Sequence, residues 1–105
     1  LVNQNPISPA PWSVKARITA YSSRVEETDD TPHITASGTN VRSGVVAANW
    51  LPFGTRVKIP ELFGQKVFVV EDRMHKRNGD KLDVWFPSTE QALRFGTQVA
   101  RIEVL

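Results

Sequence analysis

Short β-like segments, separated by Pro and Gly, constrain the fold of this chain more than any other feature of its sequence. Four of them follow one another closely, at 44–48, 55–59, 66–71 and 81–85. Short apolar segments that are rich in Val, Ile and Phe and bounded by turn residues are typical of strands. Strands at this density predict a mainly β chain that closes into a barrel.

Alternation of apolar and polar residues predicts one more strand on each side of these four. In 14–21 the apolar residues occupy the even positions, and Lys, Arg, Thr and Tyr occupy the odd ones. The last segment alternates in the same way, with Ala100, Ile102 and Val104 on one face. A period of two residues indicates a half-buried strand, so six strands are predicted in all.

One short helix is predicted over 89–95. Ser88 can cap its start, Gln91 completes a capping box, and Gly96 suits the left-handed conformation that ends a helix. The predicted apolar face of this helix consists of Ala92, Leu93 and Phe95.

The chain is predicted to form one domain. Its 105 residues leave no room for a second core, and 40% hydrophobic with 23% charged residues is typical of a folded domain. Residues 1–12 contain three Pro among polar residues and are predicted to be an extended tether, followed by a single domain over 13–105. Residues 22–43 are predicted to be a long polar loop.

Composition excludes several classes of function. The chain has no Cys, which excludes thiol catalysis, disulfides and Cys-based zinc sites. His33 and His75 lack a second ligand at a regular spacing, so neither a metal nor a cofactor is expected. A net charge of only +2 argues against a nucleic-acid partner. No apolar run approaches the roughly 20 residues of a transmembrane segment.

Three blocks of the sequence resemble, in order and spacing, segments of the bacterial 3D (three-aspartate) domain family. They are VVAANWLPFGTRVKIP, VFVVEDRMHKRNGDKLDVWFP and EQALRFG, and the resemblance covers roughly 18–105. This family is similar in fold to MltA-type lytic transglycosylases and RlpA-like proteins. The resemblance implies a six-stranded double-psi β-barrel with one short helix, peptidoglycan glycan strands as the partner, and an extracytoplasmic location in the cell envelope or after secretion.

Two of the family's three acidic positions are present as Asp72 and Asp83. At the first position, in 46–50, this sequence has no carboxylate. Three interpretations remain open: Asn49 replaces the acid structurally, the activity is altered, or Asp29 or Asp30 supplies a carboxylate from the long loop.

Asp83 is the predicted general acid. Strand alternation places it on the same face as Trp85, on which a sugar ring could stack. A carboxyl beside apolar groups and a second carboxylate, here Asp72, has a raised pKa, which a general acid needs near neutral pH. The alternative is that Asp83 is satisfied by backbone amides or by Arg73.

For activity, the resemblance implies a lytic transglycosylase, a lyase that cleaves between N-acetylmuramic acid and N-acetylglucosamine without water and leaves 1,6-anhydro-muramic ends. Asp83 and Asp72 are the predicted catalytic residues. The alternative is a non-catalytic domain that binds cell-wall glycan in the same groove, which the missing acid favours. A purely structural barrel would instead have Asp83 fully paired in a salt bridge and no cleft beside it.

Four further residues are assigned by sequence to binding, turn or core roles. Thr35 is a candidate substrate contact, although its hydroxyl could merely satisfy turn amides. Trp50 is a candidate sugar-stacking residue or a core residue, and His75 is predicted to line the cleft or to be an ordinary loop residue. Phe53 is expected in the core. Residues 78–80, Asn-Gly-Asp, are predicted to be the turn of a hairpin.

Overall fold

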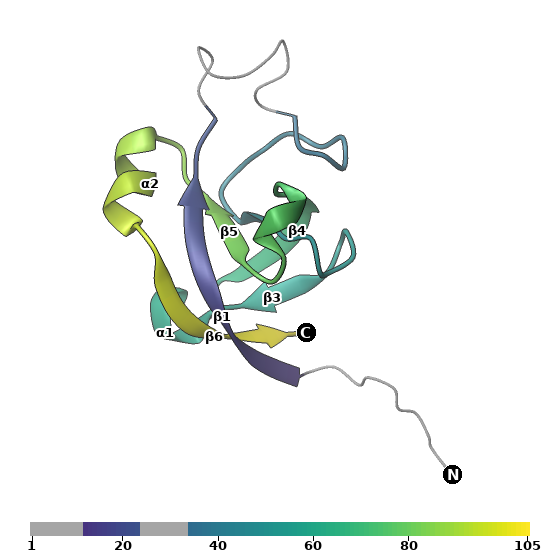
Figure 1. The fold of residues 1–105 in the computed structure, drawn as a ribbon, viewed down its shortest axis with the longest axis vertical. Coiled ribbons are helices and arrows are strands. Elements are labelled where there is room, and N and C mark those ends of the chain that lie inside the picture. The colour runs from purple at the N-terminus through teal and green to yellow at the C-terminus, as the bar shows by residue number, and fades with distance from the viewer. Residues whose placement is uncertain (1–11, 24–33) are drawn as a thin grey trace.

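The computed structural model describes residues 12–23 and 34–105, and these residues form six strands and three short helices (Figure 1). The strands are β1 (Trp12–Tyr21), β2 (Val45–Ala47), β3 (Arg56–Lys58), β4 (Val67–Asp72), β5 (Leu82–Trp85) and β6 (Gln98–Val104). The helices are α1 (Pro60–Phe63), the 3₁₀ helix η2 (Lys76–Asn78) and α2 (Thr89–Phe95). The prediction of a mainly β chain with six strands is therefore confirmed.

The strands pair in the order β1-β5-β2-β4-β3-β6, and β6 pairs back with β1, so the ring of pairings closes on itself. Two pairs, β1 with β5 and β2 with β4, are parallel. The other four pairs are antiparallel. Because β5 lies between β1 and β2, it brings together segments that are far apart in the sequence.

The core lies on the inner face of this ring, where alternate residues of most strands meet. Its largest members with almost no exposed surface are Phe68, Ile18, Ile59, Leu82, Ile102, Val46, Val57, Val70 and Val84. In β2 all three residues are buried. In β6 the predicted alternation is confirmed, since Ala100, Ile102 and Val104 are buried while Val99 is 60% exposed. The opposite, outer face of the strands is therefore free to carry polar groups.

Helix α2 has the predicted bounds and caps. The Ser88 hydroxyl accepts a hydrogen bond from the amide of Gln91, and Gly96 has φ 68°. The predicted apolar face is only partly correct. Ala92 is buried and Phe95 packs on the core, but Leu93 is 76% exposed. Residues three apart lie on one side of a helix, and Leu93 lies beside that stripe rather than within it.

Two other predictions need correction. Lys81 donates its amide hydrogen to the carbonyl oxygen of Asn78, so a turn exists at 78–81, but it does not join a hairpin because β2 separates β4 from β5. Phe53 is 44% exposed instead of buried, and the guanidinium of Arg73 lies 3.7 Å from its ring centroid. This cation–π contact with Arg73 stabilises the exposed ring of Phe53.

At the start of the chain, Trp12 already belongs to β1 and pairs with Val104. The strand therefore includes the last residue of the predicted tether, and 1–11 lie outside the described residues. None of the helices among the described residues is long and apolar enough to cross a membrane.

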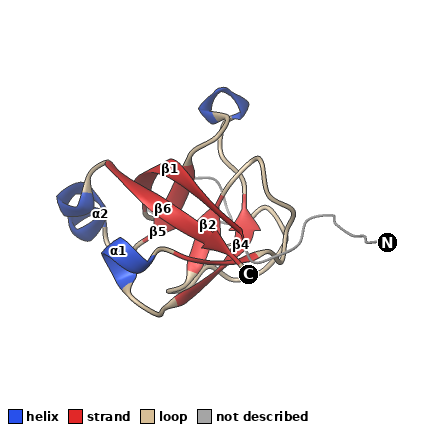
Figure 2. Cartoon of the chain, turned by 90° about the horizontal axis from the view of Figure 1, so that it is seen from below, coloured by secondary structure: helices blue, strands red, loops and turns tan. Residues whose placement is uncertain are grey.

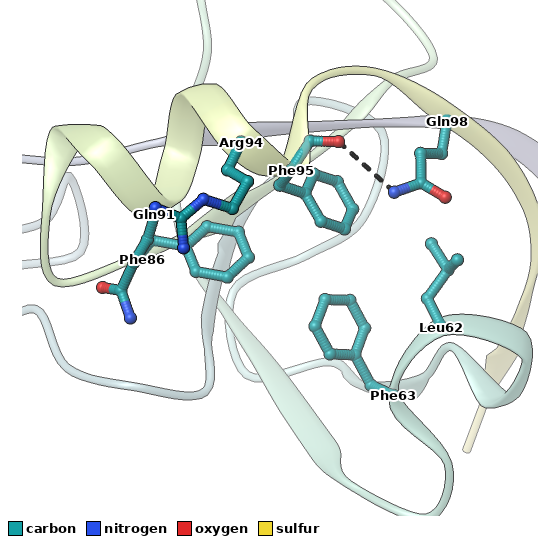
Figure 3. Close-up of a pocket in the computed structure, with 7 residues that line it drawn as sticks. All are labelled: Leu62, Phe63, Phe86, Gln91, Arg94, Phe95 and Gln98. Atoms are coloured by element: carbon teal, nitrogen blue, oxygen red, sulfur yellow. Dashed lines mark hydrogen bonds between the residues drawn. The ribbon is translucent and has the colours of Figure 1, made fainter.

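Helix α1 was not predicted, and together with α2 it flanks one side of the strands (Figure 2). Phe63 of α1 stacks on Phe95 with ring centroids 5.7 Å apart and meets Phe68 of the core edge-on. Figure 3 shows an open pocket of about 330 Å³ between the two helices. Its lining residues are Leu62, Phe63, Phe86, Gln91, Arg94, Phe95 and Gln98. None of the predicted site residues lines it.

Candidate functional site

The two predicted acids lie in one row across neighbouring strands. In the strand register Asp83 of β5 is opposite Thr19 of β1 on one side and Ala47 of β2 on the other. Ala47 is in turn the partner of Asp72 on β4. With strands about 4.8 Å apart, the two aspartate backbones are on the order of 10 Å apart, within reach of converging side chains.

The alternation predicted for β5 is confirmed. Leu82 and Val84 point into the core, while Asp83 and Trp85 are half-buried on the outer face. The indole nitrogen of Trp85 donates to the hydroxyl of Ser23 at 3.3 Å. The carboxyl and the aromatic ring therefore share one surface, as the sequence indicated.

The environment of Asp83 favours its protonated form. The pKa of this carboxyl is raised to about 6, chiefly by burial and also by the nearby charge of Asp72, while a hydrogen bond from Thr19 and the charge of Lys81 act in the opposite direction. The hydroxyl of Thr19 donates to Oδ1 at 2.9 Å. Within 12–23 and 34–105 no ion pair involves Asp83, in contrast to the fully paired carboxylate of a purely structural barrel.

Asp72 is held firmly by donors. Its Oδ1 accepts hydrogen bonds from the amides of Ala36 and Arg73, both at 2.9 Å. Its Oδ2 accepts from the hydroxyl of Tyr21 at 2.8 Å. All three partners donate, an arrangement that suits an ionised carboxylate. Asp72 and Asp83 are thus close but differently surrounded, one held by donors and the other desolvated.

Tyr21 is a member of this site that sequence reasoning missed. Burial, the charge of Asp72 and the hydrogen bond to it raise the pKa of the Tyr21 hydroxyl far above its ordinary range, so it stays protonated and remains a donor. The strand pattern placed Tyr21 on the polar face of 14–21. Only the pairing of β1 with β5, which the sequence does not reveal, brings it to the acids.

Thr35 lies in the turn that approaches Asp72. It is 5% exposed, and its hydroxyl accepts from the amide of Thr39 and contacts the Thr39 hydroxyl at 2.7 Å. The hydroxyl is therefore occupied within the turn, as in the turn role considered for it. The neighbouring amide, that of Ala36, is the one that reaches Asp72.

Trp50 and His75 lie on loops at the ends of the strands. The Trp50 indole donates to the carbonyl oxygen of Lys81 at 2.9 Å, and its half-buried ring lies 6.4 Å from that of Trp12. Trp50 also lines a small pocket of about 140 Å³. His75 caps η2, where its Nδ1 accepts from the amide of Arg77. Within the described residues, the hydrogen bond of the His75 ring is therefore to its own loop.

Asn49, considered above as a structural replacement for an acid, makes backbone contacts. Its Oδ1 accepts from the amide of Met74, and its Nδ2 donates to the carbonyl oxygen of His75. An aspartate could make the first contact but not the second, which needs a donor. Asn49 thus fastens the segment that follows β4. The other candidates for the missing acid, Asp29 and Asp30, lie outside the described residues, as does His33.

The described part of the chain contains no group of three or more His, Cys, Asp or Glu that could hold a metal ion. No family model matches the chain, and no curated protein sequence matches it. The site has to be interpreted from its own geometry.

Proposed function

We propose that this chain is a double-psi β-barrel of the 3D domain family, located outside the cytoplasm, that cleaves peptidoglycan glycan strands as a lytic transglycosylase. The observation that carries the proposal is the desolvated Asp83, whose pKa of about 6 lies close to physiological pH, beside a second carboxylate on the outer face. A closed ring with two parallel and four antiparallel pairs supports the barrel assignment.

In the proposed reaction Asp83 acts first as an acid and then as a base. Its proton passes to the glycosidic oxygen as the bond from that oxygen to C1 of the muramic residue breaks. The C6 hydroxyl of the same residue then attacks C1 and gives its proton to the Asp83 carboxylate, which restores the acid. Because the nucleophile belongs to the same sugar, its effective concentration can reach on the order of 10⁵ M.

Asp72 and Tyr21 have supporting roles in this scheme. The charge of Asp72 raises the pKa of Asp83 and also favours the positive charge that develops at C1. The Tyr21 hydroxyl donates to Oδ2 of Asp72 and holds that carboxyl group in place. Trp85, on the same face, offers an aromatic surface for a sugar ring.

A non-catalytic glycan-binding domain is the second candidate. The observation that favours it is the lack of a carboxylate in 46–50, where the side chain of Asn49 is committed to the backbone at 74 and 75. A site of this kind would bind glycan without cleaving it.

The deciding experiment is incubation of purified peptidoglycan with the protein and with Asp83→Asn, followed by mass spectrometry of the released fragments. The protein should release 1,6-anhydro-muramic products, and Asp83→Asn should reduce their rate at least about 100-fold, since general acid–base catalysis contributes that much or more. Glu90→Gln is the matched control, because this carboxylate is exposed on α2 and paired only with Arg94.

Two results would contradict the enzyme proposal. Equal release by the protein and by Asp83→Asn would remove Asp83 from the mechanism. If neither releases fragments while both sediment with peptidoglycan, the binding-domain candidate replaces the enzyme.

A further inference from the structure

A second pocket, of about 480 Å³, opens beside the first half of β1. Its lining residues are Lys15, Ala16, Arg17, Asp80, Lys81 and Val99. Three of these residues are cationic and one is acidic, so the pocket carries an excess of positive charge. Neither the fold nor the proposed reaction accounts for it.

The strand register places this pocket next to the acid. Arg17 precedes Thr19 by two residues on β1, and Lys81, immediately before β5, precedes Asp83 by two, in parallel strands where Thr19 and Asp83 are partners. Side chains two residues apart point to the same face of a strand and are separated by about 7 Å. The pocket and the acid therefore lie along one outer surface. The charge of Lys81 lowers the pKa of Asp83, which independently indicates their proximity.

The cations of the pocket have few partners within the described residues. Lys15 and Arg17 are exposed, and no ion pair within 12–23 and 34–105 involves either of them or Lys81. Among the described residues, the Lys81 ammonium donates to the Asn78 amide oxygen at 3.5 Å. Ammonium and guanidinium groups that converge in this way can form charge-assisted hydrogen bonds with an anion.

An aromatic surface adjoins the cations. The smaller pocket of about 140 Å³ is lined by Val14 and Trp50 and shares Lys15, Ala16 and Asp80 with the basic pocket. Rings of this kind receive the apolar face of a sugar, and the neighbouring cations then meet an acidic group attached to it.

We propose that the pocket of Lys15, Arg17 and Lys81 binds a carboxylate carried by the sugar next to the scissile bond. This inference rests on the proposed function. The muramic residue carries a lactyl group that ends in a carboxylate when the peptide stem is absent. When the stem is present, the lactyl group is an amide and the carboxylates belong to the peptide. Either source offers the same chemistry to the three cations.

Binding is measured by isothermal titration calorimetry in the Asp83→Asn background, so that no ligand is consumed. Three ligands are compared: a tetrasaccharide of alternating N-acetylglucosamine and N-acetylmuramic acid with free lactyl carboxylates, its lactyl methyl ester, and the same glycan with peptide stems. The test variant is Arg17→Gln with Lys81→Gln. Arg94→Gln with Lys58→Gln, which removes the same charge outside the pocket, is the control.

The proposal predicts that the test variant binds one or both acidic ligands about five- to tenfold more weakly, while the ester and the control variant are unaffected. Affinity for the acidic ligand should also fall with added salt. A loss with the free lactyl form identifies that carboxylate, and a loss with the stem form alone identifies the peptide. Equal binding of acid and ester, together with equal binding of the stem form by the test variant and by the unchanged pocket, overturns this inference and leaves the proposed function standing. If the protein with the unchanged pocket binds none of the three glycans, both this inference and the proposed function are overturned.

Discussion

At the scale of single residues, Tyr21 is the side chain on which the arrangement of the two acids most depends. Its hydroxyl donates to Asp72 Oδ2, and the other two donors to that carboxylate are backbone amides. Among the described residues, a side chain therefore holds Asp72 through one of its two oxygens.

We expect Tyr21→Phe to lower the free energy of unfolding by about 1.5–3 kcal/mol, since hydrogen bonds to charged groups contribute that much. It should also lower the pKa of Asp83, because a less firmly held Asp72 can turn its charge away toward water. Urea unfolding and a carboxyl ¹³C NMR titration measure the two effects. Thr55→Val, which removes a hydroxyl bonded only to the carbonyl of Pro52, is the control. An unchanged Asp83 titration in Tyr21→Phe would contradict this account.

Residue roles were predictable from sequence where strand alternation decided them. Asp83 and Trp85 lie together on the outer face because they are two positions apart on one strand. Phe53 and Leu93 were assigned to buried positions on residue type alone, and both are exposed. A large apolar side chain favours burial, but the geometry of its loop or helix decides whether it can be buried.

At the scale of elements, the turn from Ile34 to Arg42 is fastened to the end of β4 largely through Glu71. Its carboxylate accepts hydrogen bonds from the guanidinium of Arg42 and from the hydroxyl of Thr39, and its carbonyl oxygen accepts from the amide of Ser37. The hydrogen bonds from the two side chains, of which that from Arg42 has the larger effect, lower the pKa of Glu71 to about 2. The same turn supplies the amide of Ala36 to Asp72.

Glu71→Gln should therefore loosen this turn. We expect amide hydrogen exchange at 35–39 to accelerate about three- to tenfold, because the bidentate contact with Arg42 is lost. In the unchanged protein the same acceleration should develop only as the pH falls from about 4.5 towards 2, where Glu71 becomes protonated. Glu90→Gln, which removes a surface ion pair on α2, should leave these amides unaffected. Equal exchange in both variants would show that the turn is held by its backbone contacts alone.

The elements themselves were largely predictable, because each strand carries its own apolar pattern and α2 its own caps. Helix α1 was missed although Pro60 at its start, Glu61 in its first turn and Gly64 after its end are all helix signals. Its four residues are too few for an apolar period. The hairpin expected at 78–80 failed for a different reason, since turn residues indicate a reversal and not which strands then pair.

At the scale of the whole molecule, a carboxyl with a raised pKa makes stability depend on pH. The folded chain holds the Asp83 proton up to about pH 6, whereas the unfolded chain releases it near the ordinary value of 3.8. Between these values the folded state binds more protons, so the contribution of Asp83 to stability falls as pH rises from about 4 and is fully lost above about 6. The titratable groups that lie near the Asp83 carboxyl are Asp72, Tyr21 and Lys81.

Asp83→Asn should remove this loss. We expect the free energy of unfolding of the variant, minus that of the unchanged protein, to be about 1–3 kcal/mol larger at pH 8 than at pH 4. One pKa unit corresponds to about 1.4 kcal/mol. Urea unfolding at both pH values measures the difference. Subtracting the two proteins at each pH cancels carboxylates such as Glu71, whose contribution has the opposite sign. A constant difference between the two proteins would mean that Asp83 titrates alike in the folded and unfolded chains.

The strand order could not be read from the sequence, and the site depends on it. Thr19, Ala47, Asp72 and Asp83 come from four strands, and they form one row because β5 lies between β1 and β2 while β2 pairs with β4. Local patterns define strands one at a time. Their pairing is decided by which inner faces fit together over long separations in the chain.

The position of β6 in the ring has a consequence for synthesis on the ribosome. This strand, which comes after all the others, pairs with β1 on one side and β3 on the other. Until it leaves the exit tunnel, both of those strands present open edges, and such edges invite pairing with other chains. The ring of strands can therefore close only after β6 has been translated, and until then chaperones would have to keep these edges from pairing with other chains.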